Sequence, residues 1–240
     1  GSGLVASHQP TEVNTHYPKI AIVGGGIGGT ALAVACLDRG IPFTLYEKDQ
    51  SFASRSQGYG LTLQQASKAI EGLGIFDLDK GVISTRHVVH NPDGKIIGEW
   101  GMRKWIGEPT ENNSKRKNIH IARQSLRLAL LERLEGNTSI QWDHTFVDCS
   151  DNHEKGLDIH FKINGKTEIH KADLLVGADG IRSAVRGLII DEQKNPLNYL
   201  GCIVILGICP LNYLKDLKSP LLDSATVFQT VNGKERIYAM

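Results

Sequence analysis

The stretch KIAIVGGGIGGTALAVACLD, residues 19–38, decides the fold class of this chain. It opens with a short, apolar, branched run that predicts a strand, and it closes with a stretch rich in Ala and Leu that predicts a helix. The glycines between them fit G-x-G-x-x-G, with Gly24, Gly26 and Gly29 at the key positions. In that motif the first glycine permits the tight turn, the second lets the backbone approach a pyrophosphate, and the third lets the helix pack on the strand. A glycine cluster alone would indicate only a turn, but the flanking strand and helix favour nucleotide binding at the helix N-terminus.

An acidic residue follows at the position where such a unit reads the ribose. Residues 43–46 predict a second strand, which completes a βαβ unit, and Glu47 closes it about 18 residues after Gly29. A separation of about 20 residues is typical of an acid that accepts hydrogen bonds from the ribose hydroxyls, and an acid there disfavours a 2′-phosphate. We therefore expect FAD or NAD, rather than NADP, at this site, with Glu47 and Lys48 as candidate contacts. The alternative is a solvated, charged strand end at residues 47–49.

Composition and charge restrict the possible partners. The chain has 240 residues, and its 27 Lys and Arg against 26 Asp and Glu leave a net charge of +1, so no global field favours nucleic acid or an anionic membrane. Four cysteines and nine histidines show no metal-ligand spacing, so we expect no metal site. The apolar stretch 202–209 is too short to cross a membrane, which takes about 20 residues, and predicts a buried strand. Residues 1–17 resemble a flexible tail rather than a signal peptide, so we expect a cytoplasmic protein.

The rest of the chain alternates strands with two helices. Helices are predicted at residues 63–73 and 124–134, and the polar stretch 101–118 predicts an exposed loop, beside which Trp100 and Trp105 either line a substrate entrance or simply pack. Further strands are predicted at residues 82–89 and 95–100, which flank an Asn-Pro-Asp-Gly turn and form a hairpin, and at 119–122, 140–142, 146–149, 157–163, 168–170, 174–177, 199–209, 225–230 and 236–240.

A second signature, LLVGADGIRSAVR at residues 174–186, separates FAD from NAD. It consists of a buried, parallel-type strand, an Asp-Gly turn and a short helix. The segment resembles the Asp-Gly segment of the single-component, FAD-dependent aromatic-ring hydroxylases, which include phenolic-acid, urate and tetracycline monooxygenases. In that family the segment lies beside FAD and is associated with FAD and NAD(P)H binding, so the resemblance gives Asp179 this role. The alternative, a strand-to-helix turn without a binding role, would explain the Asp-Gly pair but not the Arg and Ser residues that follow it.

Four further residues take possible roles from the same resemblance. Arg123 matches the family's flavin-contacting arginine in an R-x-x-L setting, where its planar fork would bind cofactor oxygens; the alternative is a surface arginine at a helix terminus. Arg55 and Thr62 stand in the stretch that passes the flavin ring in relatives, as a nicotinamide and a flavin contact respectively. Phe146 stands where relatives hold the adenine by main-chain bonds, although its side chain also suits a core position.

The resemblance implies an α/β fold in two domains. The first is a doubly wound, Rossmann-like FAD-binding domain at residues 18–80 and 118–190. The second is a partly antiparallel, C-terminally incomplete substrate domain at residues 81–117 and 191–240. In the family NAD(P)H reduces FAD, O₂ adds to give a C4a-hydroperoxide, and one oxygen atom passes to an electron-rich organic ring. The implied partners are thus a small organic substrate and O₂, and no catalytic side chain is required.

One feature of the family is absent from this sequence. Full members carry a late Gly-Asp pair that meets the ribityl-pyrophosphate, and no Gly-Asp pair occurs here. We therefore expect that the missing C-terminal part belongs to a longer protein or to another chain. The alternatives are a flavin dehydrogenase or halogenase on the same scaffold, and a non-catalytic FAD- or NAD-binding fragment.

Overall fold

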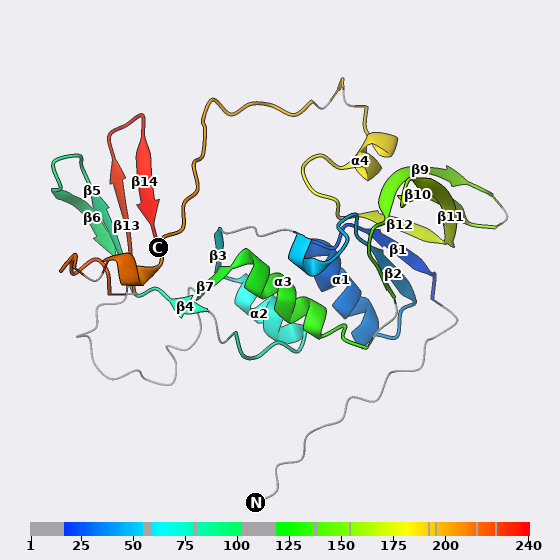
Figure 1. Cartoon of the computed structure of the whole chain (residues 1–240), viewed down its shortest axis with the longest axis horizontal. Helices are drawn as coiled ribbons and strands as arrows, with labels where there is room; N and C mark the ends of the chain where they lie inside the picture. The colour runs from blue at the N-terminus through cyan, green and yellow to red at the C-terminus, as the bar shows by residue number, and fades with distance from the viewer. Residues whose placement is uncertain are drawn as a thin grey trace, which may run out of the picture. The chain divides into compact units, whose positions relative to one another are not determined.

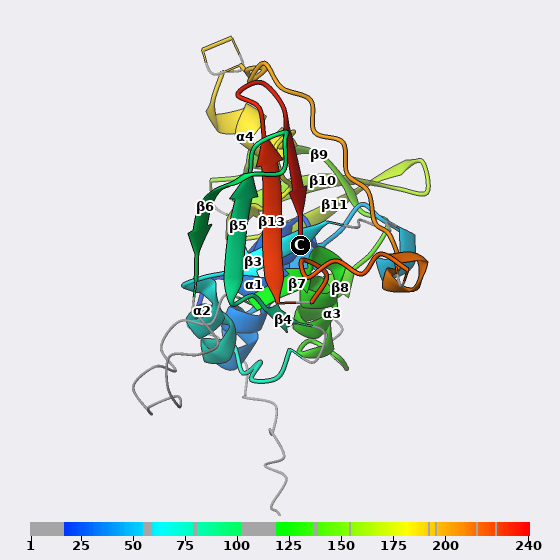
Figure 2. The same cartoon turned by 90° about the vertical axis from the view of Figure 1, so that its left-hand side faces the viewer.

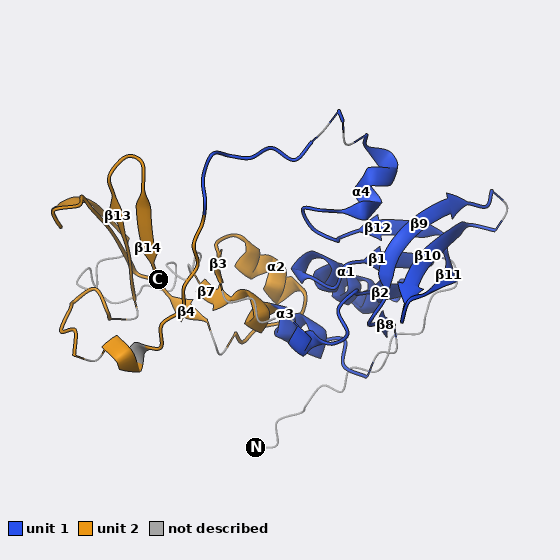
Figure 3. Ribbon diagram, turned by 45° about the horizontal axis from the view of Figure 1, so that its top comes forward, with its two compact units in different colours: residues 1–56, 127–203 blue, residues 57–126, 204–240 orange. Residues whose placement is uncertain are grey.

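The chain forms two compact units in the computed structural model (Figure 3). The first comprises residues 1–56 and 127–203, and the second comprises residues 57–126 and 204–240. The structure describes residues 17–54, 59–78, 81–101, 119–136, 139–153, 155–191, 193–194, 196–214, 216–223 and 225–240. The predicted tail therefore lies outside the described residues up to residue 16, and so do residues 102–118 of the predicted loop, with Trp105.

A four-stranded parallel sheet in the order β12-β1-β2-β8 forms the base of the first unit (Figures 1 and 3). Its strands are β1 (Ile20–Val23), β2 (Phe43–Tyr46), β8 (Ile140–Gln141) and β12 (Leu174–Gly177). Helix α1 (Ile27–Asp38) connects β1 to β2, which confirms the predicted βαβ unit. Because β12 and β2 pair with opposite edges of β1, the chain leaves the end of β1 at a point where the strand order switches direction.

An antiparallel sheet in the order β11-β10-β9 covers one face of the parallel sheet, and α1 lies on the other side (Figures 1 and 3). Its strands are β9 (Thr145–Asp151), β10 (Leu157–Ile163) and β11 (Lys166–Ala172). The rings of Tyr46 and Phe161 stack between the sheets with centroids 4.2 Å apart. The buried residues of this core are Ala21, Val23, Tyr46, Phe146, Ile159, Phe161, Ala172 and Val185. Residues far apart in sequence thus fix the carboxyl ends of β1, β2 and β12 in one packed layer.

Three further helical segments, each shorter than α1, follow strands of the sheets. The 3₁₀ helix η1 (Phe52–Ser54) follows β2, and α4 (Ala184–Ile189) follows β12. Helix α3 (Arg123–Glu132) contributes residues to both units. None of the helices in the described ranges is long and apolar enough to cross a membrane.

The second unit contains two sheets. The smaller is antiparallel, in the order β3-β7-β4, and the larger is mixed, in the order β14-β13-β5-β6, with β13 parallel to β5 (Figure 2). The elements are β3 (Gly60–Leu63), α2 (Ala66–Gly72), β4 (Val82–Ile83), β5 (Arg86–His90), β6 (Ile96–Trp100), β7 (Ile119–Ala122), η3 (Leu211–Leu214), β13 (Thr226–Val231) and β14 (Arg236–Ala239).

The predicted hairpin around the Asn-Pro-Asp-Gly turn is confirmed. Strands β5 and β6 pair antiparallel, and the backbone N–H of Asn91 donates to the carbonyl of Lys95 over 2.9 Å. Gly94 has φ +79°, a conformation that favours glycine. The prediction of one strand over residues 82–89 is wrong, however, because β4 pairs with β7 in the smaller sheet while β5 enters the larger one.

The prediction of a strand at residues 199–209, buried over residues 202–209, is wrong. The segment has no regular secondary structure, and its apolar side chains are exposed, Ile205 to 92% and Ile203 to 83%. An apolar, β-branched run becomes a buried strand only when another strand pairs with it, and no strand of the described ranges does so. The pattern indicated β propensity but could not supply the partner.

Two other elements differ from expectation. The helix predicted from residue 63 begins at Ala66, because Leu63 is 4% exposed as the last residue of β3, where it pairs with Ile119. Strand β12 is parallel to β1 as expected, but it is not fully buried, and Leu174 is 45% exposed. Apolar content alone does not distinguish a sheet edge from its centre.

Candidate functional site

The glycine turn after β1 has the backbone that its sequence requires. Gly24 has φ +107°, in the region that favours glycine, and a Cβ on it would collide with the carbonyl oxygen of Ala178. A Cβ on Gly29 would collide with the carbonyl oxygen of Gly24. A Cβ on Gly26, in contrast, would meet no atom within 4 Å. Two of the three glycines therefore close the turn, and the third faces open space.

The N-terminus of α1 is shaped for an anion. Gly26 is the N-cap residue and has no side chain that could cap the helix, and the first turn carries no acidic residue. A Cβ on Gly28 would also meet no atom within 4 Å, so there is space beside the first helical turn. The first N–H groups of a helix lack intrahelical acceptors, and the helix dipole favours negative charge there. This cradle fits a pyrophosphate.

Glu47 lies directly beside this turn. Its carboxylate accepts a hydrogen bond from the backbone N–H of Gly25 at 2.7 Å and another from that of Asp49 at 3.0 Å. The side chain is buried, with 7% of the residue exposed, whereas Lys48 next to it is exposed. Each carboxylate oxygen keeps a second lone pair. Glu47 is thus held rigidly with acceptor capacity left over, which suits a ribose hydroxyl.

A buried arginine at the same turn was missed by the sequence analysis. The Nε of Arg127 donates to the carbonyl of Gly25 over 2.6 Å, and its Nη2 lies 3.8 Å from Oε2 of Glu47. The one available signal was its position, because a charged residue stood within an otherwise apolar helix face, four residues after Arg123 and therefore on the same side.

The Asp-Gly turn lies beside the glycine turn, and its side chains cap a helix. The backbone N–H of Ala178 donates to the carbonyl of Val23 over 2.7 Å, which joins the ends of β12 and β1. The carboxylate of Asp179 accepts from the backbone N–H of Ala184 at 2.8 Å and from the hydroxyl of Ser183 at 2.5 Å. These bonds account for Asp179 and Ser183 structurally, as a cap on α4 at the carboxyl end of β12.

Arg186 also belongs to this cap. Its backbone N–H donates to the Ser183 hydroxyl over 2.9 Å, and its guanidinium donates to the carbonyl of Ile181 over 2.7 Å. A helix-capping turn therefore explains more of this segment than the sequence analysis allowed, and it positions Asp179 at the sheet edge where β1 also ends.

Phe146 is a core residue on β9. It is 9% exposed, and its ring packs edge-on against Phe161 with centroids 6.1 Å apart. The β9-β10 register shifts beside it, because Phe161 pairs with Phe146 while His160 pairs with Asp148. The side chain therefore serves packing, and the residue skipped by this bulge leaves the local main chain outside the regular ladder.

Three predicted residues remain, of which the structure describes two. Thr62 and Arg123 are residues of the second unit, and Arg55 lies outside the described residues. The backbone N–H of Arg123 donates to the carbonyl of Tyr59 over 3.1 Å. The guanidinium carbon of Arg123 lies 5.4 Å from the centroid of the Tyr59 ring.

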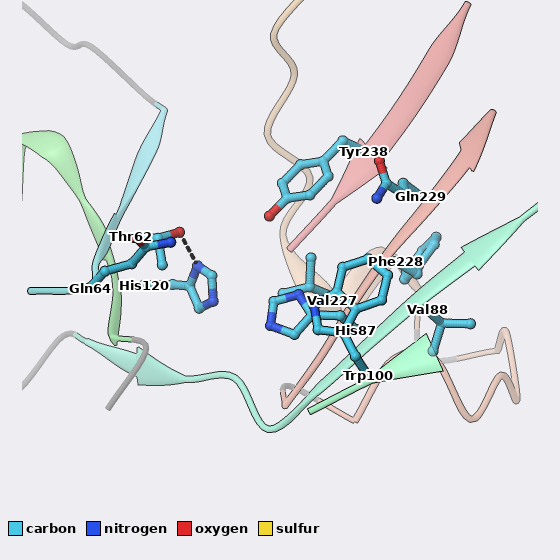
Figure 4. Close-up of a pocket in the computed structure, with 10 residues that line it drawn as sticks. All are labelled: Thr62, Gln64, His87, Val88, Trp100, His120, Val227, Phe228, Gln229 and Tyr238. Atoms are coloured by element: carbon cyan, nitrogen blue, oxygen red, sulfur yellow. Dashed lines mark hydrogen bonds between the residues drawn. The ribbon is translucent and has the colours of Figure 1, made fainter. Parts of the chain in front are cut away.

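Thr62 lines a pocket in the second unit with a volume of about 280 Å³ (Figure 4). The rings of His87 and Trp100 are stacked on one wall, 5.4 Å between centroids and 4° from parallel. Figure 4 also shows Tyr238 directing its phenol toward the space. The lining residues are Thr62, Gln64, His87, Val88, Trp100, His120, Val227, Phe228, Gln229 and Tyr238.

A chain of hydrogen bonds runs through the polar side of this pocket. Nδ1 of His120 shares a hydrogen bond of 2.9 Å with the hydroxyl of Thr62, and its Nε2 shares one of 2.5 Å with Ser84. Ser84 in turn lies 3.4 Å from Nε2 of His87. Burial, with a smaller contribution from His87, lowers the pKa of His120 below its ordinary value. The pocket therefore presents a neutral imidazole and aromatic walls. No group of three or more His, Cys, Asp or Glu in the described ranges is arranged to hold a metal ion.

Comparison with known proteins gives one consistent match. Residues 17–195 match the sequence model of a protein family described as "FAD binding domain". A protein of Arthroderma benhamiae named "Probable FAD-dependent monooxygenase" is 30% identical over 189 residues, and the match covers 74% of this chain and 40% of that protein. The chloroplastic zeaxanthin epoxidase of an Oncidium hybrid cultivar is 34% identical over 209 residues, with 83% of this chain and 30% of the epoxidase covered.

A solved structure supports the fold. The crystal structure of Klebsiella pneumoniae HpxO complexed with FAD and uric acid superposes with a TM-score of 0.65 at 20% identity, covering 94% of this chain and 53% of HpxO. The chain spans 40% and 30% of the length of the two relatives above, and about half of HpxO.

Proposed function

The chain belongs to the FAD-binding domain family, and from that premise we propose that it carries the FAD site of a monooxygenase that hydroxylates a small, electron-rich organic ring. One observation carries the proposal: the glycine turn, Glu47 and the Asp179 turn meet at the carboxyl ends of the adjacent parallel strands β2, β1 and β12. Ligands of open α/β sheets bind at such a switch point.

The proposed cofactor contacts follow from this geometry. The pyrophosphate of FAD lies against Gly26 and the N-terminus of α1, and Glu47 accepts from the adenosine ribose. Asp179, at the sheet edge beside the glycine turn, contacts the cofactor directly or through water. Lys48 and the main chain near Phe146 are candidate contacts of the adenosine half.

Three further cofactor contacts are proposed on the family resemblance alone. We assign Arg123 and Thr62 to FAD, and Arg55 to the nicotinamide cofactor, on the family resemblance. Residues 18–80 and 118–190 then form the cofactor domain, and residues 81–117 and 191–240 form the substrate side.

The aromatic pocket is the proposed substrate site. A volume of about 280 Å³ suits a one- or two-ring ligand. The stacked His87 and Trp100 present a planar wall to such a ring, and the phenol of Tyr238, which is directed toward the space in Figure 4, can donate to or accept from a ring substituent. The enzyme's role is to position the ring beside the flavin and to exclude water.

The proposed reaction consumes one NAD(P)H, one proton and one O₂ for each ring hydroxylated, and releases NAD(P)⁺ and water. Bound FAD supplies the redox chemistry by accepting hydride and activating O₂ at its C4a position, as the resemblance implies. The alternative function of a flavin dehydrogenase differs in the fate of the oxygen, because a dehydrogenase transfers no oxygen atom to the organic product.

The experiment is an isotope measurement on the FAD-loaded protein. The protein is supplied with NADH or NADPH under ¹⁸O₂ and offered urate, 3-amino-4-hydroxybenzoate, 2,6-dihydroxypyridine and a tetracycline, and the products are analysed by mass spectrometry. A monooxygenase incorporates one ¹⁸O atom into the product of at least one compound. Oxidation of one of these compounds without ¹⁸O in the product and without consumption of NAD(P)H would contradict the proposal and favour a dehydrogenase, in which the organic compound itself supplies the hydride.

A further inference from the structure

Arg127 occupies a position that normally favours an apolar side chain. It lies on α3 within the face that contains Leu126 and Leu130, each no more than 1% exposed, and Arg127 itself is 6% exposed. An arginine is almost never buried to this degree unless it is paired, because removing its charge from water is costly.

Its contacts fix the direction of the guanidinium. Nε donates to the carbonyl of Gly25 over 2.6 Å, and the guanidinium carbon lies 5.4 Å from the ring centroid of Phe52 and 5.8 Å from that of Trp142. Contacts of a planar cation with two aromatic rings hold it in one orientation. Arg127 thus connects α3 to the glycine turn, to η1 and to the end of β8.

The pairing of the charge is incomplete. Nη2 lies 3.8 Å from Oε2 of Glu47, too far for a hydrogen bond, and this buried nitrogen has no hydrogen-bond partner. A buried donor without a partner lowers stability, and an apolar residue of similar volume would remove that cost. The arrangement is therefore poorly explained as a stabilising device.

Gly25 links the two charged side chains. Its carbonyl accepts from Arg127, and its N–H donates to Oε2 of Glu47 over 2.7 Å. A displacement of the guanidinium would rotate the peptide units around Gly25 and would move the donor that orients the carboxylate.

We propose that Arg127 is a positioning residue for the adenosine half of FAD, acting through Gly25 and Glu47 to aim the carboxylate at the ribose hydroxyls. The proposal goes beyond oxygen transfer and stands if hydroxylation fails, but it rests on the ribose role proposed for Glu47. Its signature is a change in ribose recognition rather than a change in stability.

The test measures how strongly the protein distinguishes ADP from 2′-deoxy-ADP, each as a competitor of FAD, whose binding is followed by flavin fluorescence. We expect the wild type to prefer ADP by about tenfold, the equivalent of a hydrogen bond to a charged group. In Arg127→Met this preference falls toward unity. Arg127→Lys keeps the charge but lacks the planar fork, and is expected to lose most of the preference as well. Arg133→Met is the matched control, because Arg133 follows the same helix and pairs with Asp38 at 2.7 Å, away from the glycine turn.

The possible outcomes distinguish the ribose role of Glu47 from the positioning role of Arg127. A wild-type preference near unity would show that Glu47 does not read the ribose, and would overturn both. A tenfold wild-type preference that persists in Arg127→Met and Arg127→Lys would overturn the role of Arg127 alone. If neither variant folds, judged by thermal unfolding, Arg127 is a structural residue and the proposal fails. In a Glu47→Gln background Arg127→Met should weaken FAD binding little further, whereas an equal loss in both backgrounds would also contradict the proposal.

Discussion

The backbone N–H of Gly25 donates a 2.7 Å hydrogen bond to the carboxylate of Glu47, which stands 22 residues later at the end of the neighbouring strand. This bond joins the turn after β1 to the end of β2, so the proposed phosphate cradle and the proposed ribose acceptor have a fixed relative position. The site is therefore formed before any ligand arrives, which lowers the ordering cost of binding.

Glu47→Gln tests the ribose role of this carboxylate. The amide oxygen can still accept from the N–H of Gly25. The second carboxylate oxygen is replaced by an NH₂ group, which donates, and the negative charge is lost. We expect the dissociation constant of FAD, measured by fluorescence titration, to rise about tenfold. Asp49→Asn makes the same chemical change two residues later, where no cofactor role is assigned, and is expected to bind FAD as the wild type does. Equal affinities of Glu47→Gln and wild type would contradict the role.

Gly29→Ala tests the close packing of the glycine turn. The added Cβ would overlap the carbonyl oxygen of Gly24, so the helix must shift away from the strand. We expect the free energy of unfolding to fall by about 1 to 3 kcal/mol, as measured by urea denaturation. An unchanged unfolding free energy would mean that the turn and helix adapt without cost.

The sequence predicted the glycine turn better than it predicted the sheets. The strand, the glycine turn and the helix were found because two of the three key glycines have a local reason: a positive φ at Gly24, and a close backbone approach at Gly29. Such constraints depend on neighbours in sequence and leave a readable motif.

What depends on distant partners could not be predicted. Ile205 stands in a segment with the composition of a buried strand, yet it is 92% exposed, because no described strand pairs with that segment. Arg127 was overlooked for the same reason: its partners Gly25 and Glu47 lie 102 and 80 residues away, and a charged residue in an apolar helix face does not indicate which residues it contacts.

Asp179 and Ser183 separate helix capping from cofactor binding. Ser183→Ala removes the hydroxyl that accepts from the N–H of Arg186, and should lower the unfolding free energy by about 1 kcal/mol while leaving FAD affinity unchanged. Asp179→Asn also weakens the cap, and in addition should weaken FAD binding about threefold to tenfold. If both variants bind FAD like the wild type, Asp179 serves only the helix.

His170 gives the first unit a defined pH response. Burial, together with the nearby His144, lowers the pKa of His170, so the folded protein holds it neutral while the unfolded chain takes up a proton below about pH 6.5. Because the unfolded state binds more protons, stability is full above that pH and is lost as the pH falls toward the folded pKa.

The corresponding variant is His170→Gln, which retains a polar partner for the hydroxyl of Tyr46. Its melting temperature should fall less than that of the wild type between about pH 7.5 and about pH 5.5. His153→Gln, at an exposed position, is the control and should keep the wild-type difference. A variant with the full wild-type pH dependence would exclude His170 as the source.

FAD titration of Gly26→Ala and Gly28→Ala tests the placement of the cofactor most directly. Both glycines have open space where a Cβ would stand, so both variants should fold and melt like the wild type. At Gly26 the methyl group would occupy the space assigned to the pyrophosphate, and we expect FAD affinity to fall at least about a hundredfold. Gly28 is not a key position of the motif, and its variant should bind within about threefold of the wild type. Wild-type affinity in a folded Gly26→Ala variant would contradict the proposed site.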